Sequence, residues 1–597
     1  MIQRLSAYTG FGAACTFSTA ATSAALVVAI QNPTTGYELS IYASTSWPVW
    51  VLIVINTVVC VVLLLREAVA GNQSRRWLIP LGILMANGLL VILMSVVRGY
   101  YAMGGDTLIH IGYTMDLTNG LVSSLNFYPA AHVIPAGLNL LGVPLNVATG
   151  LSPAIWYVVY VASFYWLAKL LFKDKRLVIL VSTLAAVLLL PHGPALVATP
   201  LAASMFPLTL LVVLKLRQDF RVRYLVCYLA LLAVLLFTHP LALEALVIAL
   251  GVACVVLVKN RWKLAGLTAV TLVLLVWWAG YWYHLDTARI LPWNDTEATT
   301  ALVDPTELDS TEPSSILSVE NTTSILPSLT GVEATQTIGT SSGVSLILRR
   351  YGGEILLGGL AAVSLVLLLL RKGYRNKYVF LSGLFVAFNV VWFAGWYLSL
   401  GVYESFLIRL MYWVPVVSIL LAAPLFLRML DSQRLRRLSI AGTFAILIAI
   451  SGYAVFNLYA SPITGTQNLQ TTHQEIKGMT WLIENGDPDT YIVHLNSQRV
   501  SRYVAVLHGY EWVHQHRSTY WLVQYEPKLM GLFNYNDHSS VGDKYADDIY
   551  LVVTKLDRLL PRWEEDKLYL LETDEAATLI YKDSDEFEVW YVEGHKQ

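Results

Sequence analysis

Residues 47–65 read WPVWVLIVINTVVCVVLLL and contain no charged side chain. A helix needs about 20 apolar residues to cross the hydrocarbon core of a bilayer, so this stretch predicts a membrane-spanning helix. The rest of the chain is similar in character: 56% of its 597 residues are hydrophobic, 14% are charged, and the mean hydropathy is +0.56. This composition excludes a soluble protein of that size and is typical of polytopic helical membrane proteins.

Apolar runs of comparable length recur along the chain, and about 13 of them qualify as membrane spans. The first run follows Arg4 and resembles a signal peptide, but it is longer than a usual signal core, which favours a retained span. The predicted spans are 11–31, 47–65, 77–98, 153–172, 177–191, 195–214, 224–238, 241–258, 264–284, 348–370, 378–398, 410–428 and 438–460.

Basic residues occur in every second loop between these spans, and the loops between are not basic. Because cytoplasmic loops carry the excess of Lys and Arg, this alternation predicts the orientation of the chain in the cell (plasma) membrane. The N-terminus is expected to be cytoplasmic. The segments 98–152, 285–343 and 399–409 and the C-terminal part are expected outside the cell. The basic groups are Arg66/Arg75/Arg76, Lys173/Lys175/Arg176, Lys215/Arg217/Arg221/Arg223, Lys259/Arg261/Lys263, Arg371/Lys372/Arg375/Lys377 and Arg434/Arg436/Arg437.

The C-terminal part differs from the rest in charge. Residues 463–597 carry 22 Asp and Glu against 12 Lys and Arg, whereas the remainder carries 19 against 28. This part mixes a helical run, HQEIKGMTWLIENG, with strand-like runs, TYIVHL, IYLVVT and FEVWYVEG. We therefore expect three units: two N-terminal spans in 1–76, a transmembrane core in 77–460 with large loops at 98–152 and 285–343, and a small soluble α/β domain in 461–597.

The first large external loop contains the stretch GGDTLIHIGYTMDL, residues 104–117. If this stretch is helical, Asp106 and His110 lie one turn apart on one face, because successive residues advance by about 100°. Asp116 lies to the side of Asp106, and the remaining positions are largely apolar. The pattern predicts a helix in the membrane plane whose polar stripe lines the mouth of a membrane cavity, where water solvates the charges.

A second segment of this kind, NFYPAAHVIPAGLNLLG, contributes Tyr128 and His132. For His132 and Asp116, hydrogen bonding and solvation of an ordinary external loop explain their presence equally well. The Gly pair before Asp106 permits a tight turn, which favours a carboxylate held at a defined place.

Here the sequence resembles a family. An acidic residue soon after an early span, a first large external loop with two in-plane helices, many spans and an external C-terminal domain resemble the GT-C superfamily. These are integral-membrane glycosyltransferases that use polyprenyl-phosphate sugars; protein O-mannosyltransferases and the aminoarabinose transferase of lipid A belong to them. The resemblance covers roughly 77–460 and depends on this layout and on the stretch GGDTLIH…YP..H.

The resemblance implies that Asp106 is the loop carboxylate that acts as general base or organises a divalent ion, Mg²⁺ or Mn²⁺. The residue pattern adds His110 and Asp116 as further catalytic candidates. The chain departs from the family pattern in three ways. The first large loop has no adjacent Asp-Glu pair, that loop has no Asp-x-Asp, and the tail has no tryptophan-rich acceptor motif. The acceptor class and the use of a metal are therefore open.

A lipid phosphate leaving group calls for cations, and external Lys and Arg are scarce in the predicted topology. Arginine suits phosphate because its planar fork forms bidentate hydrogen bonds. The candidates for binding the lipid phosphate are Arg409, Arg350 and Arg98. Snorkelling to the interface explains Arg409 equally well, and an i,i+4 pair with Glu354 is the simpler account of Arg350.

Further polar residues occur at the outer ends of predicted spans. His192, His239 and Glu244 are candidates for lining the same cavity as Tyr128 and His132. An ionisable residue within a membrane is a functional hypothesis by default. A structural hydrogen-bonding role is the alternative for the histidines.

Two functions follow from these residues. The first is transfer of a sugar from a polyprenyl (dolichyl) phosphate donor to a protein or lipid-linked glycan acceptor on the external face. The alternative is a transporter or flippase of a polar or lipid-linked sugar cargo, with Asp106, His110 and Glu244 in the pathway. Transporters usually place such residues near the bilayer midplane within repeated halves, and no repeat is evident here. Membrane lipids are expected partners, and a nucleic acid is not.

Overall fold

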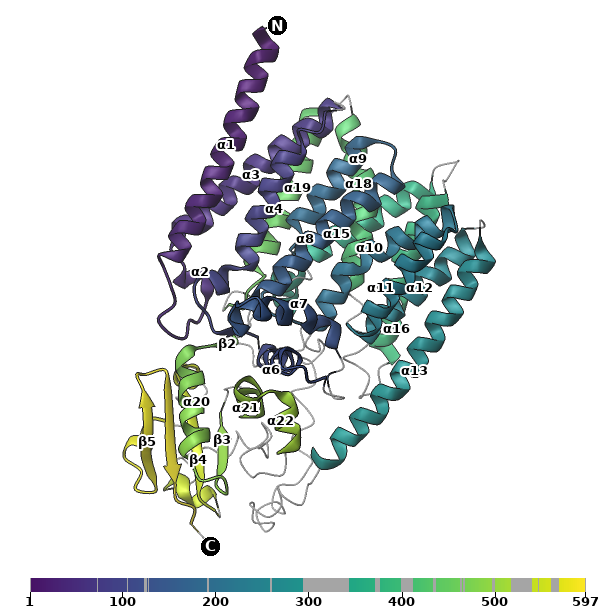
Figure 1. Cartoon of the computed structure of the whole chain (residues 1–597). Coiled ribbons are helices and arrows are strands. Elements are labelled where there is room, and N and C mark those ends of the chain that lie inside the picture. The colour runs from purple at the N-terminus through teal and green to yellow at the C-terminus, as the bar shows by residue number, and fades with distance from the viewer. Residues whose placement is uncertain are drawn as a thin grey trace.

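The computed structural model describes residues 2–595 except 72–73, 105, 123–125, 127, 190–192, 258–259, 294–342, 371–375, 399–411, 433–435, 462–463, 465–467, 496–499, 517–538, 546 and 560–567. Figure 1 shows two parts: a body of long helices with roughly parallel axes, and a small α/β domain against one end of it. The N-terminus lies at the far end of the body, and the C-terminus lies in the small domain.

The body consists of helices that share one large apolar core. A short helix, α2 (Ile41–Ser44), lies in the connection between the first two long ones. The body helices are α1 (Ile2–Ile30), α3 (Trp47–Ala70), α4 (Leu78–Ile92), α5 (Met94–Val97), α8 (Leu145–Leu171), α9 (Lys175–Val187), α10 (Ala198–Gln218), α11 (Val222–Leu236), α12 (Pro240–Val256), α13 (Arg261–Trp293), α15 (Gly343–Leu369), α16 (Asn376–Leu398), α18 (Val414–Asp431) and α19 (Arg436–Phe456).

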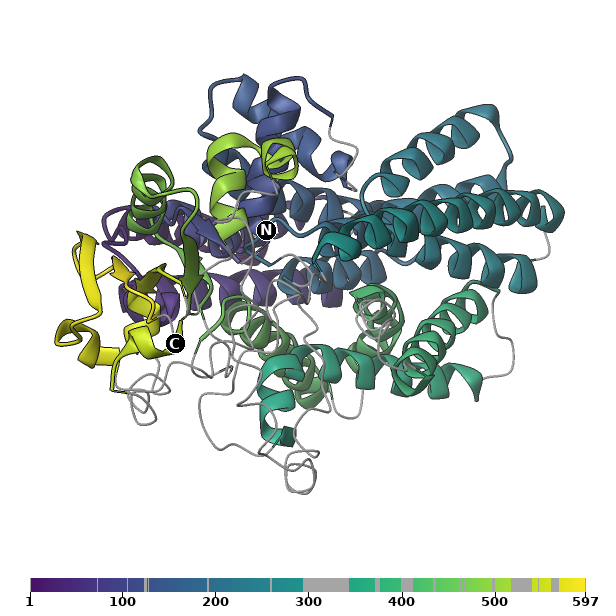
Figure 2. The ribbon, with the colours of Figure 1, turned by 90° about the horizontal axis from the view of Figure 1, so that it is seen from below.

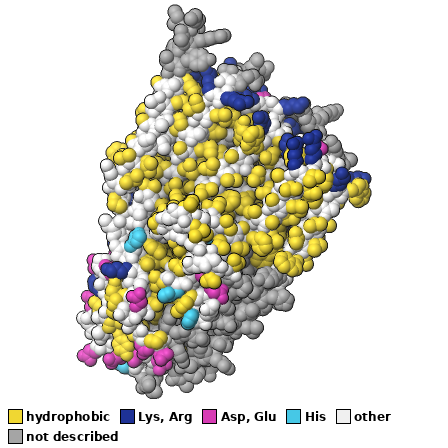
Figure 3. Space-filling model, viewed as in Figure 1, with side chains coloured by type: hydrophobic (Ala, Val, Ile, Leu, Met, Phe, Trp, Pro, Cys, Tyr) yellow, Lys and Arg dark blue, Asp and Glu magenta, His cyan; other side chains and the backbone are white. Residues whose placement is uncertain are grey.

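Each predicted span coincides with one of these helices. Within the described part of the chain, eight helices are long and apolar enough to cross a membrane, and four shorter apolar helices accompany them. The remaining predicted span, 177–191, is the 13-residue α9. Apolar side chains cover the outer surface of the body (Figure 3), as expected where lipid tails replace water. The prediction of a polytopic helical membrane protein is confirmed; the number of crossings stays a prediction.

Two short helices lie between the body and the C-terminal domain. They are α6 (Thr107–Thr118) and α7 (Pro129–Leu140), at the positions where the sequence predicts in-plane helices. Figure 1 shows them across the end of the body, at a large angle to its long helices. Before α6, β1 (Ala102–Met103) pairs antiparallel with β2 (Gln470–Thr471), which leads into the C-terminal domain.

The C-terminal domain is built on a four-stranded sheet with the order β3-β4-β6-β5. The strands are β3 (Tyr491–His494), β4 (Ile549–Thr554), β5 (Ala577–Asp583) and β6 (Phe587–Val592). β3 and β4 are parallel, and the other neighbours are antiparallel. The domain also contains α20 (His473–Asn485), α21 (Val500–His508), α22 (Tyr510–Gln515) and α23 (Lys555–Leu559), with short 3₁₀ turns at Val541–Lys544 and Leu568–Glu572. The predicted helix and three predicted strands are therefore present.

The apolar side of α6 packs on the C-terminal domain. Leu108 and Ile111 of α6 belong to the same hydrophobic cluster as Val504 and Ala505 of α21 and Phe587 of β6. In Figure 2, which views the molecule from the side of this domain, α21 and α22 lie over α6. The segment that contains α6 and the C-terminal domain thus form one packed unit, in which Asp106 and Arg502 meet although they are 396 positions apart.

Candidate functional site

The carboxylate of Asp106 lies at the first turn of α6, at the junction of the body and the C-terminal domain. The backbone before it is held by the β1–β2 ladder and by a hydrogen bond from the Gly104 N–H to the Leu469 carbonyl, 3.0 Å. Gly104 has a φ of +86°, a conformation that favours glycine. A side chain there would also approach the Cβ of Ala195, at 3.0 Å. The turn therefore places Asp106 at a defined position, and its side chain remains 43% exposed.

Asp106 forms an ion pair with Arg502 of α21. The Nη2 atom of Arg502 donates to Oδ1 of Asp106 at 2.9 Å, and the arginine side chain is 19% exposed. Sequence reasoning missed this arginine. Val500, Tyr503 and Val504 form the buried face of α21, so Arg502 reads from sequence as an ordinary residue on the polar side of an amphipathic helix.

Close packing holds α21 along α6. A Cβ atom added at Gly112 would lie 2.7 Å from the carbonyl oxygen and 2.8 Å from the Cβ of Ala505, so the two helix backbones approach each other closely there. At the far end of α6, Oδ2 of Asp116 accepts the N–H groups of Tyr510 at 3.0 Å and Glu511 at 2.9 Å, at the start of α22. Asp116 is 3% exposed and thus fastens the C-terminal domain to α6.

His110 and His132 form a buried pair that joins α6 to α7. Their Nδ1 and Nε2 atoms, respectively, are 2.8 Å apart, and the side chains are buried. Burial lowers the pKa of His110 to about 4 and that of His132 well below its usual value, so both imidazoles are neutral at physiological pH. Among the residues that the structure describes, the buried Nδ1 atom of His132 has no hydrogen-bond partner. The rings of Tyr113 and Tyr510 continue the stack beside His132.

The prediction that the α6 stripe is solvated at a cavity mouth is therefore wrong for His110 and Asp116. The helix itself and the shared face of Asp106 and His110 are as predicted. The C-terminal domain and α7 cover that face, however, and only Asp106 retains substantial exposure. Of the three predicted catalytic residues, Asp106 alone combines a free approach from water with a charged partner.

Tyr128 and His239 meet at the start of α7. Their rings stack at 5.1 Å with an interplanar angle of 8°. His239 also caps α12, because its Nδ1 accepts the N–H of Leu241 at 3.2 Å. One turn along α12, Glu244 is half-buried. These predicted cavity residues thus lie where α7 meets the α11–α12 connection, and the stack accounts for Tyr128 and His239 structurally.

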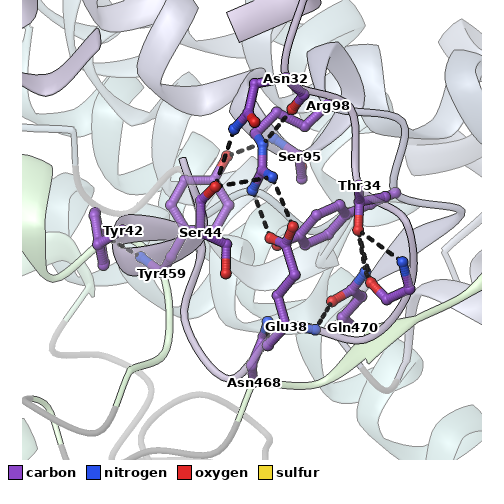
Figure 4. A network of polar contacts seen from close by, with 12 residues as sticks. Asn32, Thr34, Glu38, Tyr42, Ser44, Ser95, Arg98, Tyr459, Asn468 and Gln470 are labelled. Atoms are coloured by element: carbon purple, nitrogen blue, oxygen red, sulfur yellow. Dashed lines mark hydrogen bonds and ion pairs between the residues drawn. The ribbon is translucent and has the colours of Figure 1, made fainter. Parts of the chain in front are cut away.

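The structure gives Arg98 a role other than phosphate binding. Its guanidinium is 2% exposed and forms a bidentate pair with Glu38, at 2.5 and 2.6 Å. It also donates to the carbonyls of Asn32 at 2.9 Å and Ser44 at 3.2 Å, and the hydroxyl of Tyr100 donates to Glu38 (Figure 4). All three guanidinium nitrogens are engaged, so Arg98 fastens the α1–α2 connection to the end of α5.

The other predicted phosphate ligands do not meet at Asp106 in the described part of the chain. Arg350 lies on α15, and its Nε donates to the carbonyl of Thr464 at 2.9 Å. Arg409, the first choice, and His192 lie outside the described residues. The cation that the structure places beside Asp106 is instead Arg502.

The residues around Asp106 do not fit the divalent ion that the family resemblance implies. Asp106 is the candidate ligand, and a guanidinium already balances its charge. Among the residues described, no three His, Cys, Asp or Glu side chains are grouped so as to hold a metal ion.

Comparisons with known proteins gave structural neighbours only. No protein-family model matches the chain, and no curated protein matches it. Among solved structures, the chain is similar to ArnT from Cupriavidus metallidurans bound to undecaprenyl phosphate, with 10% identity and a TM-score of 0.44. The apo state of that protein shows 12% identity and a TM-score of 0.39. Both alignments cover 85% of this chain and 97% of the other. At these scores the likeness carries no inference about individual residues.

Proposed function

We propose that this chain is an integral-membrane glycosyltransferase of the GT-C type. It transfers a sugar from a polyprenyl-phosphate donor to a protein or lipid-linked glycan at the outer face of the cell membrane. The observation that carries the proposal is Asp106, a partly exposed carboxylate held at the junction of the apolar body and the soluble domain and paired with Arg502. A lipid donor and a water-borne acceptor can meet only at such a junction.

The distribution of charge supports the orientation. Lys and Arg gather at the end of the body that lies farthest from the C-terminal domain, whereas Asp and Glu gather on that domain (Figure 3). Because basic residues remain on the cytoplasmic side, the C-terminal domain and Asp106 lie outside. The N-terminus lies at the basic end (Figure 1) and is then cytoplasmic.

In this reaction Asp106 acts as general base. It takes the proton from the acceptor hydroxyl as the hydroxyl oxygen bonds to the anomeric carbon of the sugar. The bond between that carbon and the phosphate oxygen breaks, and its electron pair leaves with the lipid phosphate, which gains one negative charge. A cation near the leaving oxygen stabilises that charge. His110 does not take this role, because it is buried and its Nδ1 is engaged by His132; it joins the helix of the base to α7.

The test is transfer of a labelled sugar from several polyprenyl-phosphate donors by the purified full chain. Asp106→Asn should lower the rate about 100-fold or more, as expected for loss of a general base. Asp585→Asn, which removes an 89% exposed carboxylate from the same domain, should leave the rate unchanged. Full activity of the Asp106 variant would remove this residue as the base. Failure of the wild type with every donor would refute the transferase and favour a transporter.

A further inference from the structure

Arg502 belongs to the C-terminal domain, yet the packing gives it a defined position at the end of the membrane body. α21 lies against α6 with a close approach at Gly112 and Ala505. The Asp116 carboxylate holds the following turn through two backbone N–H groups. Gly509 in that turn has a φ of +90°, and a Cβ there would collide with Asp116. Both ends of the contact are therefore fixed, which holds the backbone of Arg502 beside Asp106, so that only the side chain has to move to reach another partner.

The ion pair itself is only partly shielded from water. Its side chains are 19% and 43% exposed, and pairs at such sites contribute little to stability because water screens them. Exchange of the carboxylate for another anion therefore costs little. A phosphate is a favourable replacement, because the planar guanidinium can donate two parallel hydrogen bonds to its oxygens.

The pairing also conflicts with the proposed role of Asp106. The guanidinium occupies Oδ1 of Asp106, an oxygen that would otherwise receive the acceptor's proton. If Asp106 is to accept a proton from the acceptor hydroxyl, its carboxylate has to give up the Arg502 guanidinium, or share it with another anion, when the acceptor is bound. Movement of the guanidinium to a bound phosphate would leave Oδ1 of Asp106 open to the acceptor hydroxyl when the donor arrives.

We propose that Arg502 is a donor-site residue that the C-terminal domain supplies. In the substrate-free protein its guanidinium pairs with Asp106. When the lipid donor binds, the guanidinium donates to the phosphate oxygens and leaves Asp106 able to accept the acceptor's proton. The phosphodiester of the donor carries one negative charge and the departing lipid phosphate two, so the contact strengthens as the sugar leaves. This inference rests on the proposed function for its role in turnover; the phosphate contact can be tested without turnover.

Direct binding separates this role from a purely structural ion pair. The probe is a polyprenyl monophosphate without sugar, titrated into the full-length protein in detergent, with the corresponding polyprenol as the phosphate-free control. Arg502→Gln should weaken binding of the phosphate at least about tenfold, the effect of one lost charge-assisted hydrogen bond. Asp106→Asn should keep or increase the affinity, because it removes the competing carboxylate. Polyprenol should bind the wild type and the Arg502 variant equally.

Two further variants keep the test conclusive. Arg502→Lys retains the positive charge and should recover part of the affinity for the lipid phosphate. Such a recovery would show that the loss in Arg502→Gln comes from the missing charge and not from a folding defect. Lys477→Gln removes a 73% exposed cation, paired with Asp583, from the same domain and should bind like the wild type. Equal binding of the lipid phosphate by Arg502→Gln and the wild type would overturn the proposal.

The outcomes also separate this inference from the proposed function. If the wild type transfers sugar and Arg502→Gln keeps the same KM for the donor, the transferase stands and the role of Arg502 fails. If the wild type transfers nothing but binds the lipid phosphate through Arg502, the phosphate site stands and the transferase fails. If Arg502→Gln raises the donor KM and also lowers kcat, both the transferase and the role of Arg502 are supported. The reason is that the contact is predicted to exist in the ground state and to be stronger in the transition state.

Discussion

The contact between α6 and α21 gives a sharp prediction at Gly112, where a single methyl group should displace the C-terminal domain. The Cβ of Gly112→Ala would lie 2.7 and 2.8 Å from two atoms of Ala505, one of which belongs to the helix backbone. Carbon atoms in ordinary contact lie about 3.5–4.0 Å apart, so the helices have to separate by roughly 1 Å.

Such overpacking costs roughly 1–3 kcal/mol, and a displacement of about 1 Å in an active site can lower the rate about 100-fold. We therefore expect Gly112→Ala to lower the apparent Tm by several degrees, to increase protease cleavage of the C-terminal domain, and to lower the rate of sugar transfer by about 10- to 100-fold. The reason for the loss of rate is that Arg502 and Asp106 lie on the two helices that are forced apart.

Gly137 on α7 provides the matched control, because a Cβ added there meets nothing within 4 Å. Gly137→Ala should be neutral or slightly stabilising, since alanine favours the helix. The assays are thermal unfolding in detergent, limited proteolysis, and the transfer assay on the same preparations. If Gly112→Ala matches Gly137→Ala in all three, the close approach of α6 and α21 does not hold the site, and the reasoning fails.

Two other predictions concern the buried histidine pair and the buried arginine. His110 has a folded-state pKa of about 4, against an ordinary value of 6.5. Between these pH values the unfolded chain binds more protons than the folded one. The free energy of unfolding therefore falls by roughly 3 kcal/mol as the pH drops from 6.5 to 4. His110→Asn should flatten this dependence in thermal unfolding measured from pH 7.5 to 4, and an unchanged slope would contradict the assignment. Arg98→Ala should cost about 3–5 kcal/mol, because it leaves the carboxylate of Glu38 without its guanidinium. A double variant with Glu38→Gln should recover part of that loss, whereas a phosphate-binding role would instead appear as a raised KM for the donor.

Local sequence patterns accounted for most of the secondary structure. Apolar length located every helix of the body, because a helix that crosses a bilayer has to satisfy its own backbone and present apolar side chains over a fixed length. Alternation and turn residues located β3, β4 and β6. β5 was not predicted, since its side chains are largely exposed and ATLIYKD shows no clear buried face.

The residues of the candidate site were likewise predicted only in part. The spacing of Asp106 and His110 placed them on one face of a helix, and α6 has that face. Sequence could not show that the face is covered, that Asp116 caps α22, or that Arg98 is buried in a pair with Glu38. It also gave no sign of Arg502, whose helix carries an ordinary amphipathic pattern.

The sequence by itself determined the membrane class, the helices of the body, one helix and three strands of the C-terminal domain, and the carboxylate at the start of α6, because each of these depends on interactions within about 20 neighbouring residues. The tertiary structure decided the partner of that carboxylate. Asp106 and Arg502 are 396 positions apart, and they meet only because small residues let α6 and α21 pack closely and Asp116 fixes the turn beyond. Local periodicity contains no information about such a contact, since it depends on the packing of two distant segments.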